Sequence, residues 1–278
     1  MLQSEAIFYW AAVTLYAIAA VIYLSALVFK KERWLLPAAI ITAVALLPHA
    51  AAILLRWYTV GHGPYASSYE VLSSNTWLAV ALFLAVQFKM PKVRLIGAVI
   101  LPLSVIALGV GFYLSPKINY LPPSLRGYWL FIHIFFAKLA YDCFLIGIAF
   151  AVLLLLKMSR WGSANNLLDK LPHTGRLDEL SYRFSALGFL FLAVMIIAGS
   201  IWANQAWGRY WGWDMTETWS LVTWLVYAVY LHARITYKWH NQKSAWFLIF
   251  GMVFVIITFF VLPYIPLENT HMTYFRGK

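Results

Sequence analysis

Cysteine and charged residues are scarce in this chain of 278 residues. Its single cysteine, Cys143, excludes an internal disulfide and any redox motif built on a cysteine pair. Charged residues make up 11% of the sequence and hydrophobic residues 63%, with a mean hydropathy of +0.75. This mean hydropathy is far above that of a soluble domain, and it predicts a membrane protein.

Long apolar runs recur from end to end, without a soluble domain or a convincing internal repeat between them. We therefore expect an all-α, polytopic helix bundle in which residues 1–278 form a single integral membrane domain. Eight runs are long enough to cross about 30 Å of hydrocarbon at about 1.5 Å per residue. They are residues 6–29, 34–55, 70–88, 95–114, 128–156, 184–203, 218–236 and 245–263.

The first run and the longest connector each carry a further expectation. The first run has no basic segment before it and no small-residue cleavage site, so we expect a retained helix and not a signal peptide. The longest connector, residues 157–183, is only moderately charged, and we expect a short interfacial helix near residues 164–171.

The net charge of +11 does not indicate nucleic-acid binding, because the basic residues lie in the loops between spans. Fourteen lysines and arginines follow spans 1, 3, 5 and 7, and only six lie on the opposite side. The positive-inside rule then places both termini outside the cytoplasm. The segment 202–219, between spans 6 and 7, and the tail 264–278 are also predicted to be external.

Tryptophan is concentrated in one place. Six of the 14 tryptophans fall between Trp202 and Trp224, at the edge of the membrane. A flat, aromatic and slightly polar surface suits a large planar ligand, and a tetrapyrrole fits better than a sugar, an ion or a peptide. We expect binding through shape and apolar contact by Trp202, Trp207, Trp211, Trp213, Asp214 and Trp219. Because a bare carboxylate is costly at the membrane edge, Asp214 is expected to be hydrogen-bonded within its loop.

Imidazole is the usual protein ligand of haem iron, so each of the seven histidines is a candidate. His133 lies near the outer end of span 5, and His271 lies eight residues beyond span 8. Together they could ligate one iron from opposite faces. His232 lies deep in span 7, where an imidazole is costly enough to indicate function. His49, after Pro48, could satisfy backbone groups that the proline leaves open.

Each of these histidines also has a structural interpretation. His133 is as consistent with a hydrogen-bonded interfacial residue as with a ligand. A histidine in a tail, such as His271, is usually solvated, and His232 is close enough to the inner boundary to reach the interface. His62 lies in an outer loop whose shape it is expected to support.

The motif Trp207-Gly-x-x-Trp211-Gly-Trp213-Asp214-x-x-Glu217-Thr-Trp resembles the WWD signature of haem-handling membrane proteins. With Tyr230-Leu-His232-Ala-Arg234, it is similar to the CcsA (ResC) branch of System II cytochrome c biogenesis. The likeness extends through 56–70 and 128–133. This chain differs at Met215-Thr216, where the family commonly has Pro-Lys. Its tail around His271 also lacks the family's glycine-rich pattern.

The resemblance implies that His133 and His271 ligate haem iron beside the WWD segment, while His232 ligates haem within the membrane. It implies haem b as cargo, and a ResB/CcsB-like membrane protein that supplies the second ligand for the inner haem. Other implied partners are apocytochrome c, thiol-reducing proteins and membrane lipid. The implied location is the bacterial cytoplasmic membrane, or the thylakoid in a plastid.

The implied activity is transport of haem and its covalent attachment to the CxxCH motif of apocytochrome c, as one part of a holocytochrome c synthase. No catalytic residue is expected, because the reactive groups belong to haem and the substrate thiols. The main alternative is a HemX-like regulator of tetrapyrrole metabolism that attaches nothing. The shorter HemX-like proteins lack the full WWD segment, which favours the synthase. A dihaem electron carrier would normally need two facing histidines for each haem.

Fusions with alkaline phosphatase test the topology. We expect an active enzyme when it is fused to the C-terminus, since phosphatase folds only outside the cytoplasm, and an inactive one when it is fused within residues 157–183. The reverse pattern would place the tryptophan segment in the cytoplasm and exclude the synthase.

Overall fold

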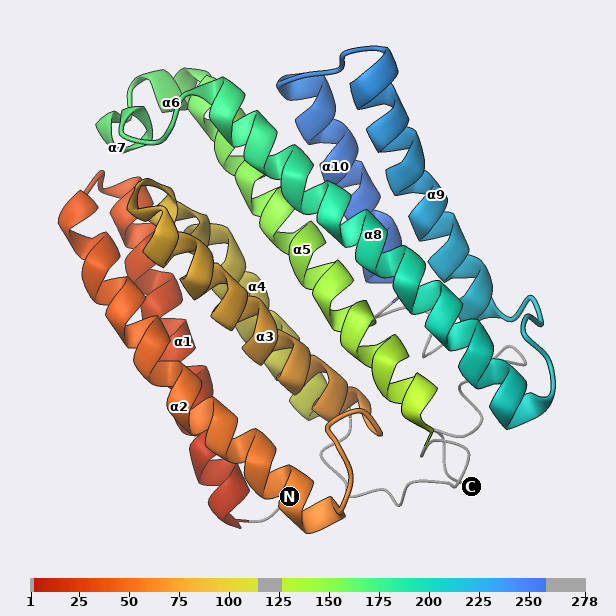
Figure 1. The fold of residues 1–278 in the computed structure, drawn as a ribbon. Coiled ribbons are helices and arrows are strands. Elements are labelled where there is room, and N and C mark those ends of the chain that lie inside the picture. The colour runs from red at the N-terminus through yellow and green to blue at the C-terminus, as the bar shows by residue number, and fades with distance from the viewer. Residues whose placement is uncertain (1–2, 115–126, 259–278) are drawn as a thin grey trace. The chain divides into compact units, whose positions relative to one another are not determined.

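The structure is a computed structural model that describes residues 3–114 and 127–258. Every regular element in these two ranges is a helix, and six of the helices are long and apolar enough to cross a membrane. The chain is therefore an all-α polytopic membrane protein, which confirms the fold class predicted from composition (Figure 1).

The chain divides into two compact units, which are described separately. The first contains residues 1–120 and 152–177, and the second contains residues 121–151 and 178–278. A single integral domain over residues 1–278 stays a prediction. The helices of the first unit are α1 (Gln3–Val28), η1 (Glu32–Trp34), α2 (Leu35–Val60), α3 (Ser68–Lys89), η2 (Pro91–Ile96) and α4 (Gly97–Leu114), with α6 (Arg160–Ser163) and α7 (Asn166–Asp169).

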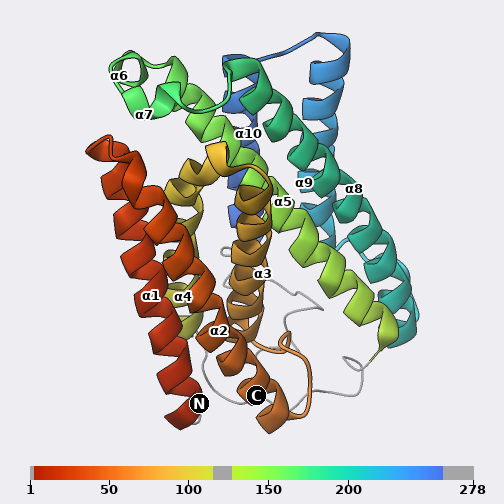
Figure 2. The ribbon, with the colours of Figure 1, turned by 60° about the vertical axis from the view of Figure 1, so that its left-hand side comes forward.

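In the first unit, α1 to α4 form two helical hairpins, each turned by a 3-10 helix. Helix α1 packs against α2 and α4, and α3 packs against α2 and α4, as the two views of Figures 1 and 2 show. Six of the eight buried residues of α1 recur at alternating steps of three and four, the spacing of a helix seam. They are Tyr9, Ala12, Tyr16, Ala19, Tyr23 and Ala26.

Helix α2 presents a matching seam of small residues, including Ala38, Ala45 and Ala52. Lipid tails are as apolar as leucine, so burial of apolar surface does not drive helices together in a membrane. Small side chains instead let backbones approach closely and gain dispersion contacts. The alanines of this seam therefore hold α1 and α2 together.

The seam's tyrosines each donate or share a hydrogen bond inside the unit. Tyr9 donates to the carbonyl of Leu108 at 2.7 Å, and Tyr23 donates to Gln87 Oε1 at 3.1 Å. Tyr16 Oη lies 3.2 Å from His49 Nδ1, while His49 Nε2 lies 3.1 Å from Ser73 Oγ. His49 thus bridges α1 and α3 through side chains. The expected role beside Pro48 was wrong, since both ring nitrogens have side-chain partners.

The second unit contains most of α5 (Tyr128–Met158) and α8 (Thr174–Trp207), together with α9 (Met215–Thr236) and α10 (Gln242–Ile256). Helices α5 and α8 lie side by side in both views (Figures 1 and 2). Ser181 donates to the carbonyl of Gly147 at 2.8 Å, and a Cβ on Gly147 or Gly188 would collide with the facing helix. These two glycines therefore set the close approach of α5 and α8.

Helix bounds differ from the predicted spans in the 157–183 connector. Helix α8 begins at Thr174, before the predicted start near residue 184. The charged residues that precede the apolar run also favour a helix, so the helix is longer than the run. The predicted interfacial helix is two short helices, because Asn165 is extended and caps α7 with its side chain.

The two remaining predicted spans are helical over α9 and α10. Neither is among the six helices that are long and apolar enough to span, and the predicted span 245–263 extends beyond the described residues. A total of eight spans, like the location of the termini, stays a prediction.

The α1 seam predicts a contrast between two alanines. Ala19 is fully buried, so Ala19→Leu should overpack the seam and destabilise the protein by about 1–3 kcal/mol. Ala11 lies exposed on the same helix, and Ala11→Leu should be nearly neutral. Thermal unfolding of both purified variants in detergent is the measurement. Equal melting temperatures for the two variants would contradict the close-packed seam.

Candidate functional site

The tryptophan segment turns sharply between α8 and α9. Helix α8 ends at Trp207, where Gly208 adopts a left-handed φ of +74°. Trp213, just before α9, also has a positive φ of +59°, which is costly for a residue with a side chain. Trp213 is nevertheless 71% exposed. Backbone strain of this kind is frequent at functional sites.

The polar residues of the motif hold this turn in place. Asp214 is the N-cap of α9, and its Oδ1 accepts the backbone N–H of Glu217 at 2.9 Å. Glu217 Oε2 accepts the N–H of Gly212 at 2.7 Å, and Thr218 Oγ1 donates to the carbonyl of Trp213 at 3.3 Å. This is an extended capping box, and the predicted hydrogen bonding of Asp214 is confirmed.

Gly212 lies in close contact with a side chain of its own segment. A Cβ there would overlap the guanidinium of Arg209, which packs over the turn. The segment is therefore a folded structure built from its own side chains.

The indoles of the segment form two edge-to-face pairs. Trp202 and Trp207 have ring centroids 4.8 Å apart, and Trp211 and Trp213 have centroids 5.8 Å apart. Trp202 is 3% exposed, whereas Trp207, Trp211 and Trp219 are half-buried. Trp213 is therefore the most exposed indole of the segment, and Trp202 is buried against Trp207 and His133.

His133 on α5 lies against this segment within the second unit. Its Nδ1 lies 2.9 Å from the carbonyl of Met195 on α8. A carbonyl only accepts hydrogen bonds, so Nδ1 carries the proton and Nε2 of the neutral ring carries the lone pair. The imidazole stacks on Trp202 at 6.2 Å between centroids. Its tautomer and orientation are those that suit a metal ligand.

Gly199 makes room for this imidazole. A Cβ at that position would lie 2.5 Å from His133 Nδ1, closer than contact allows. Next to the ring is a cavity of about 30 Å³ whose wall includes Gly199, Tyr210, Trp211 and Glu217. The structure thus brings together His133, Trp202 and Trp211 from the predicted site.

His232 lies elsewhere in the second unit, exposed in the last turns of α9. Its Nδ1 lies 3.5 Å from Thr236 Oγ1. Two residues later, Arg234 points inward and forms a bidentate ion pair with Asp178 of α8, both N···O distances being 2.7 Å. Asp178 also accepts the backbone N–H of Asn241 at 3.1 Å. The buried pair anchors the end of α9, while the side chain of His232 is exposed on the surface of the bundle.

His271, the weakest of the predicted ligands by sequence pattern, lies outside the described residues, as does the whole external tail 264–278. His62 lies in the α2–α3 turn, where its Nδ1 donates to the carbonyl of Gly63 at 2.8 Å. That bond agrees with its expected role in shaping the loop.

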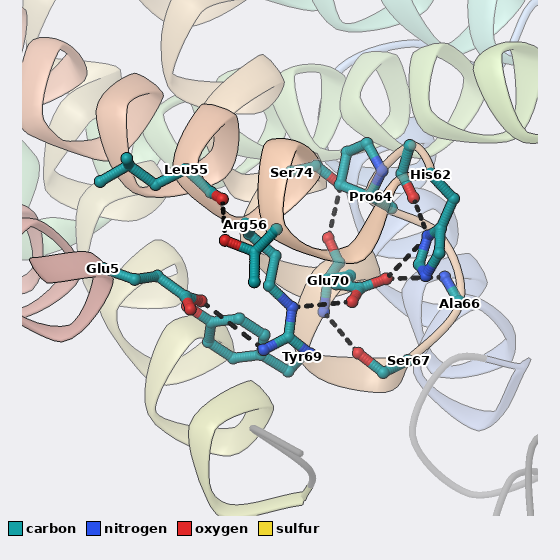
Figure 3. Close-up of polar contacts among 12 residues, drawn as sticks. Glu5, Leu55, Arg56, His62, Pro64, Ala66, Ser67, Tyr69, Glu70 and Ser74 are labelled. Atoms are coloured by element: carbon teal, nitrogen blue, oxygen red, sulfur yellow. Dashed lines mark hydrogen bonds and ion pairs between the residues drawn. The ribbon is translucent and has the colours of Figure 1, made fainter. Parts of the chain in front are cut away.

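The other signature residues of the first unit form a buried ionic network (Figure 3). Arg56 is 2% exposed and lies between two buried acids, with Nε donating to Glu70 Oε1 at 2.9 Å and Nη1 lying 3.8 Å from Glu5 Oε1. Glu70 also accepts the N–H of Ala66 at 2.9 Å, and Tyr69 donates to Glu5 at 3.1 Å. The network ties together α1, α2 and α3.

Sequence reasoning overlooked several residues that build the site. The spacing Asp214-x-x-Glu217 is a capping-box pattern and would have revealed the role of Glu217. Gly199 lies among small residues in the sequence, and none of its sequence neighbours predicts a contact with His133. The pair Asp178 and Arg234 is 56 residues apart in sequence and has no local signal.

The sequence profile described as Cytochrome C assembly protein matches residues 65–266, which is most of the chain and includes His133, the tryptophan segment and His232. The chain belongs to the CcsA family. It is 36% identical over 235 residues to the cytochrome c biogenesis protein CcsA of Trieres chinensis, covering 73% of this chain and 74% of the relative. It is 34% identical over 252 residues to CcsA of Prochlorococcus marinus strain NATL2A, covering 79% of each chain.

Among solved structures, the cytochrome c heme lyase CcmF matches with a TM-score of 0.73 at 17% sequence identity. The match covers 100% of this chain and 49% of the longer CcmF chain. At that identity the likeness shows a shared fold.

The cap of α9 predicts how two substitutions at Asp214 differ. Asp214→Ala removes the acceptor for the Glu217 N–H and should lower stability by about 1 kcal/mol. Asp214→Asn keeps a capping oxygen and should stay close to the parent. Thermal unfolding in detergent compares them. If asparagine is as harmful as alanine, the carboxylate has a task other than capping.

Proposed function

We propose that this chain holds haem b against its tryptophan segment and presents it for covalent attachment to the CxxCH motif of apocytochrome c. It would act as one part of a holocytochrome c synthase, together with a ResB/CcsB-like membrane protein. The observation that carries the proposal is the imidazole of His133. Its tautomer is set by the Met195 carbonyl, and its ring lies beside Trp211 and Trp202.

The named relatives support this proposal. The relatives from Trieres chinensis and Prochlorococcus marinus are called cytochrome c biogenesis proteins, and the solved chain with a shared fold is called a heme lyase. A role in cytochrome c maturation follows from the family, and haem attachment is the step for which a histidine beside the tryptophan segment is suited.

In the proposed reaction, each substrate thiol adds across a haem vinyl group. One S–C bond and one C–H bond form as the S–H bond and the vinyl π bond are lost, so no other product leaves. The contribution of this chain is to position haem and substrate. Holding two reacting groups in the right orientation removes a large part of the activation barrier. Thiol-reducing proteins would keep both substrate thiols reduced before the addition.

Iron ligation at this outer position is assigned to His133 and His271, and haem contact to Trp202, Trp207, Trp211, Trp213, Asp214 and Trp219. The exposed and strained Trp213 would lie against the macrocycle, while Asp214 and Glu217 hold the turn that carries it. The histidine of the CxxCH motif would then replace one of the two protein ligands.

We assign a second, inner haem position to His232. Its side chain is exposed on α9, as expected for a ligand whose opposite partner belongs to another protein. The Arg234–Asp178 pair would fix the turn that carries it. With the tryptophan segment on the outer side of the cytoplasmic or thylakoid membrane, haem would pass from His232 to His133. A HemX-like regulator remains the alternative, and it predicts no attachment.

Cavity complementation tests the outer site. His133→Gly and His271→Gly should each reduce holocytochrome c yield at least about tenfold, because one axial ligand is lost. Added imidazole should restore part of the yield by occupying the vacated position. Normal maturation in both single variants would exclude the outer ligand pair, and cytochrome c maturation unaffected by deletion of the whole chain would favour the regulator.

The contact between Gly199 and His133 gives a second test. Gly199→Ala should push the imidazole from its place and lower holocytochrome c yield, although alanine favours a helix by about 1 kcal/mol over glycine. Gly109→Ala on α4 is the matched control, since a Cβ there meets no atom within 4 Å. Equal yields from these two variants would show that the position of His133 is not critical.

A further inference from the structure

The first unit contains a cavity at the end where both of its helical hairpins turn. Its volume is about 340 Å³, larger than the cavity beside His133. The wall comes from η1, η2, the start of α2 and the α7 region. The lining residues are Glu32, Leu35, Pro91, Lys92, Leu95, Leu167, Lys170 and Leu171.

The wall of this cavity is built by the chain itself. Asn165 is fully buried and donates from Nδ2 to the carbonyl of Leu27 at 3.1 Å. Lys30 donates to the carbonyl of Ala164, and Lys170 pairs with Glu32. These bonds fasten the α6–α7 segment across the end of α1. The cavity is therefore preformed and does not need a ligand to create it.

The lining combines positive charge with apolar surface. Four leucines form one part of the wall, and two lysines stand at its rim. Glu32 offsets the charge of Lys170, whereas Lys92 makes no ion pair with any residue that the structure describes. The adjoining segments 30–33 and 89–94 add Lys30, Lys31, Arg33, Lys89 and Arg94. The site therefore suits a molecule with an anionic head and an apolar body.

The position of the cavity indicates which amphiphile that is. It lies where four apolar helices end, so its exposed lysines lie at head-group depth, while its leucines form the buried part of the wall, at 1–8% exposure. The basic residues assign this end to the cytoplasmic side, where anionic lipids are abundant and basic pockets between helices bind their head groups. None of the eight lining residues is aromatic or carries an imidazole or sulfur that would hold a haem.

We propose that this cavity binds the head group and upper acyl region of an anionic phospholipid. Lys92 and Lys170 contact the phosphate, and the leucines contact the glycerol and first methylenes. The bound lipid joins η2 to α7 and so holds the α6–α7 segment against the 3-10 turns of the two hairpins. The site involves no residue assigned to haem, so a negative result for the lipid site would leave the proposed function untouched, and the reverse also holds.

Native mass spectrometry of the purified full chain tests the proposal. The protein is titrated with phosphatidylglycerol and, separately, with phosphatidylcholine. We expect one phosphatidylglycerol to be retained preferentially, and the Lys92→Gln/Lys170→Gln double variant to bind it about thirtyfold more weakly, as two lost lysine contacts imply. Both lysines are exposed, so the variant should fold.

Lys238→Gln/Lys243→Gln is the matched control, with the same change of charge at exposed lysines of the second unit, and its affinity should change less than twofold. Equal retention of the two lipids, or an equal loss in the control, would overturn the site. Displacement of the lipid by millimolar inorganic phosphate would identify a free-anion site instead. One-for-one displacement by haem would identify a haem site, and either result would contradict the proposal.

Discussion

Polar side chains in an apolar bundle must find partners inside the protein, and the rest of this structure depends on that constraint. Water is absent at membrane depth, so an unsatisfied donor or buried charge is strongly disfavoured. At several buried groups the chain meets the constraint with pairs that each join different helices, although a few buried atoms of the described residues, such as Ser104 Oγ and Tyr227 Oη, have no hydrogen-bond partner. Tyr9, Tyr16 and Tyr23 join α1 to its neighbours, Arg56 joins α1, α2 and α3, and Arg234 joins α8, α9 and the start of α10.

The same constraint shapes the candidate site. His133 is half-buried, and the bond from its Nδ1 to Met195 satisfies one nitrogen while orienting the other. Asp214 and Glu217 are buried acids, and both accept backbone N–H groups of the turn that carries Trp213. The same hydrogen bonds thus satisfy these polar groups and hold the side chains in the orientation that the proposed ligand requires. A substitution that leaves such a group unpaired will disturb both.

The helices could be predicted from sequence because apolar runs and their lengths are local properties. The Asp214 cap was also predictable, since a carboxylate at a membrane edge needs donors and the nearest are the first N–H groups of the following helix. His49 was misassigned because its partners, Tyr16 and Ser73, lie on other helices. Gly199 and the Asp178–Arg234 pair escaped for the same reason: each acts through a contact made only when distant segments pack. The start of α8 was misplaced because a helix can continue beyond the apolar run that crosses the membrane.

The central claim is that a histidine of α5 ligates the iron while the tryptophan segment binds the macrocycle by contact alone. The most direct test is the absorption spectrum of haem that co-purifies with this chain and its ResB/CcsB-like partner. Trp211→Ala should reduce the amount of haem and leave the low-spin spectrum of the remainder unchanged. His133→Cys should change the ligation and shift the Soret band. A changed spectrum in Trp211→Ala together with an unchanged one in His133→Cys would contradict the account.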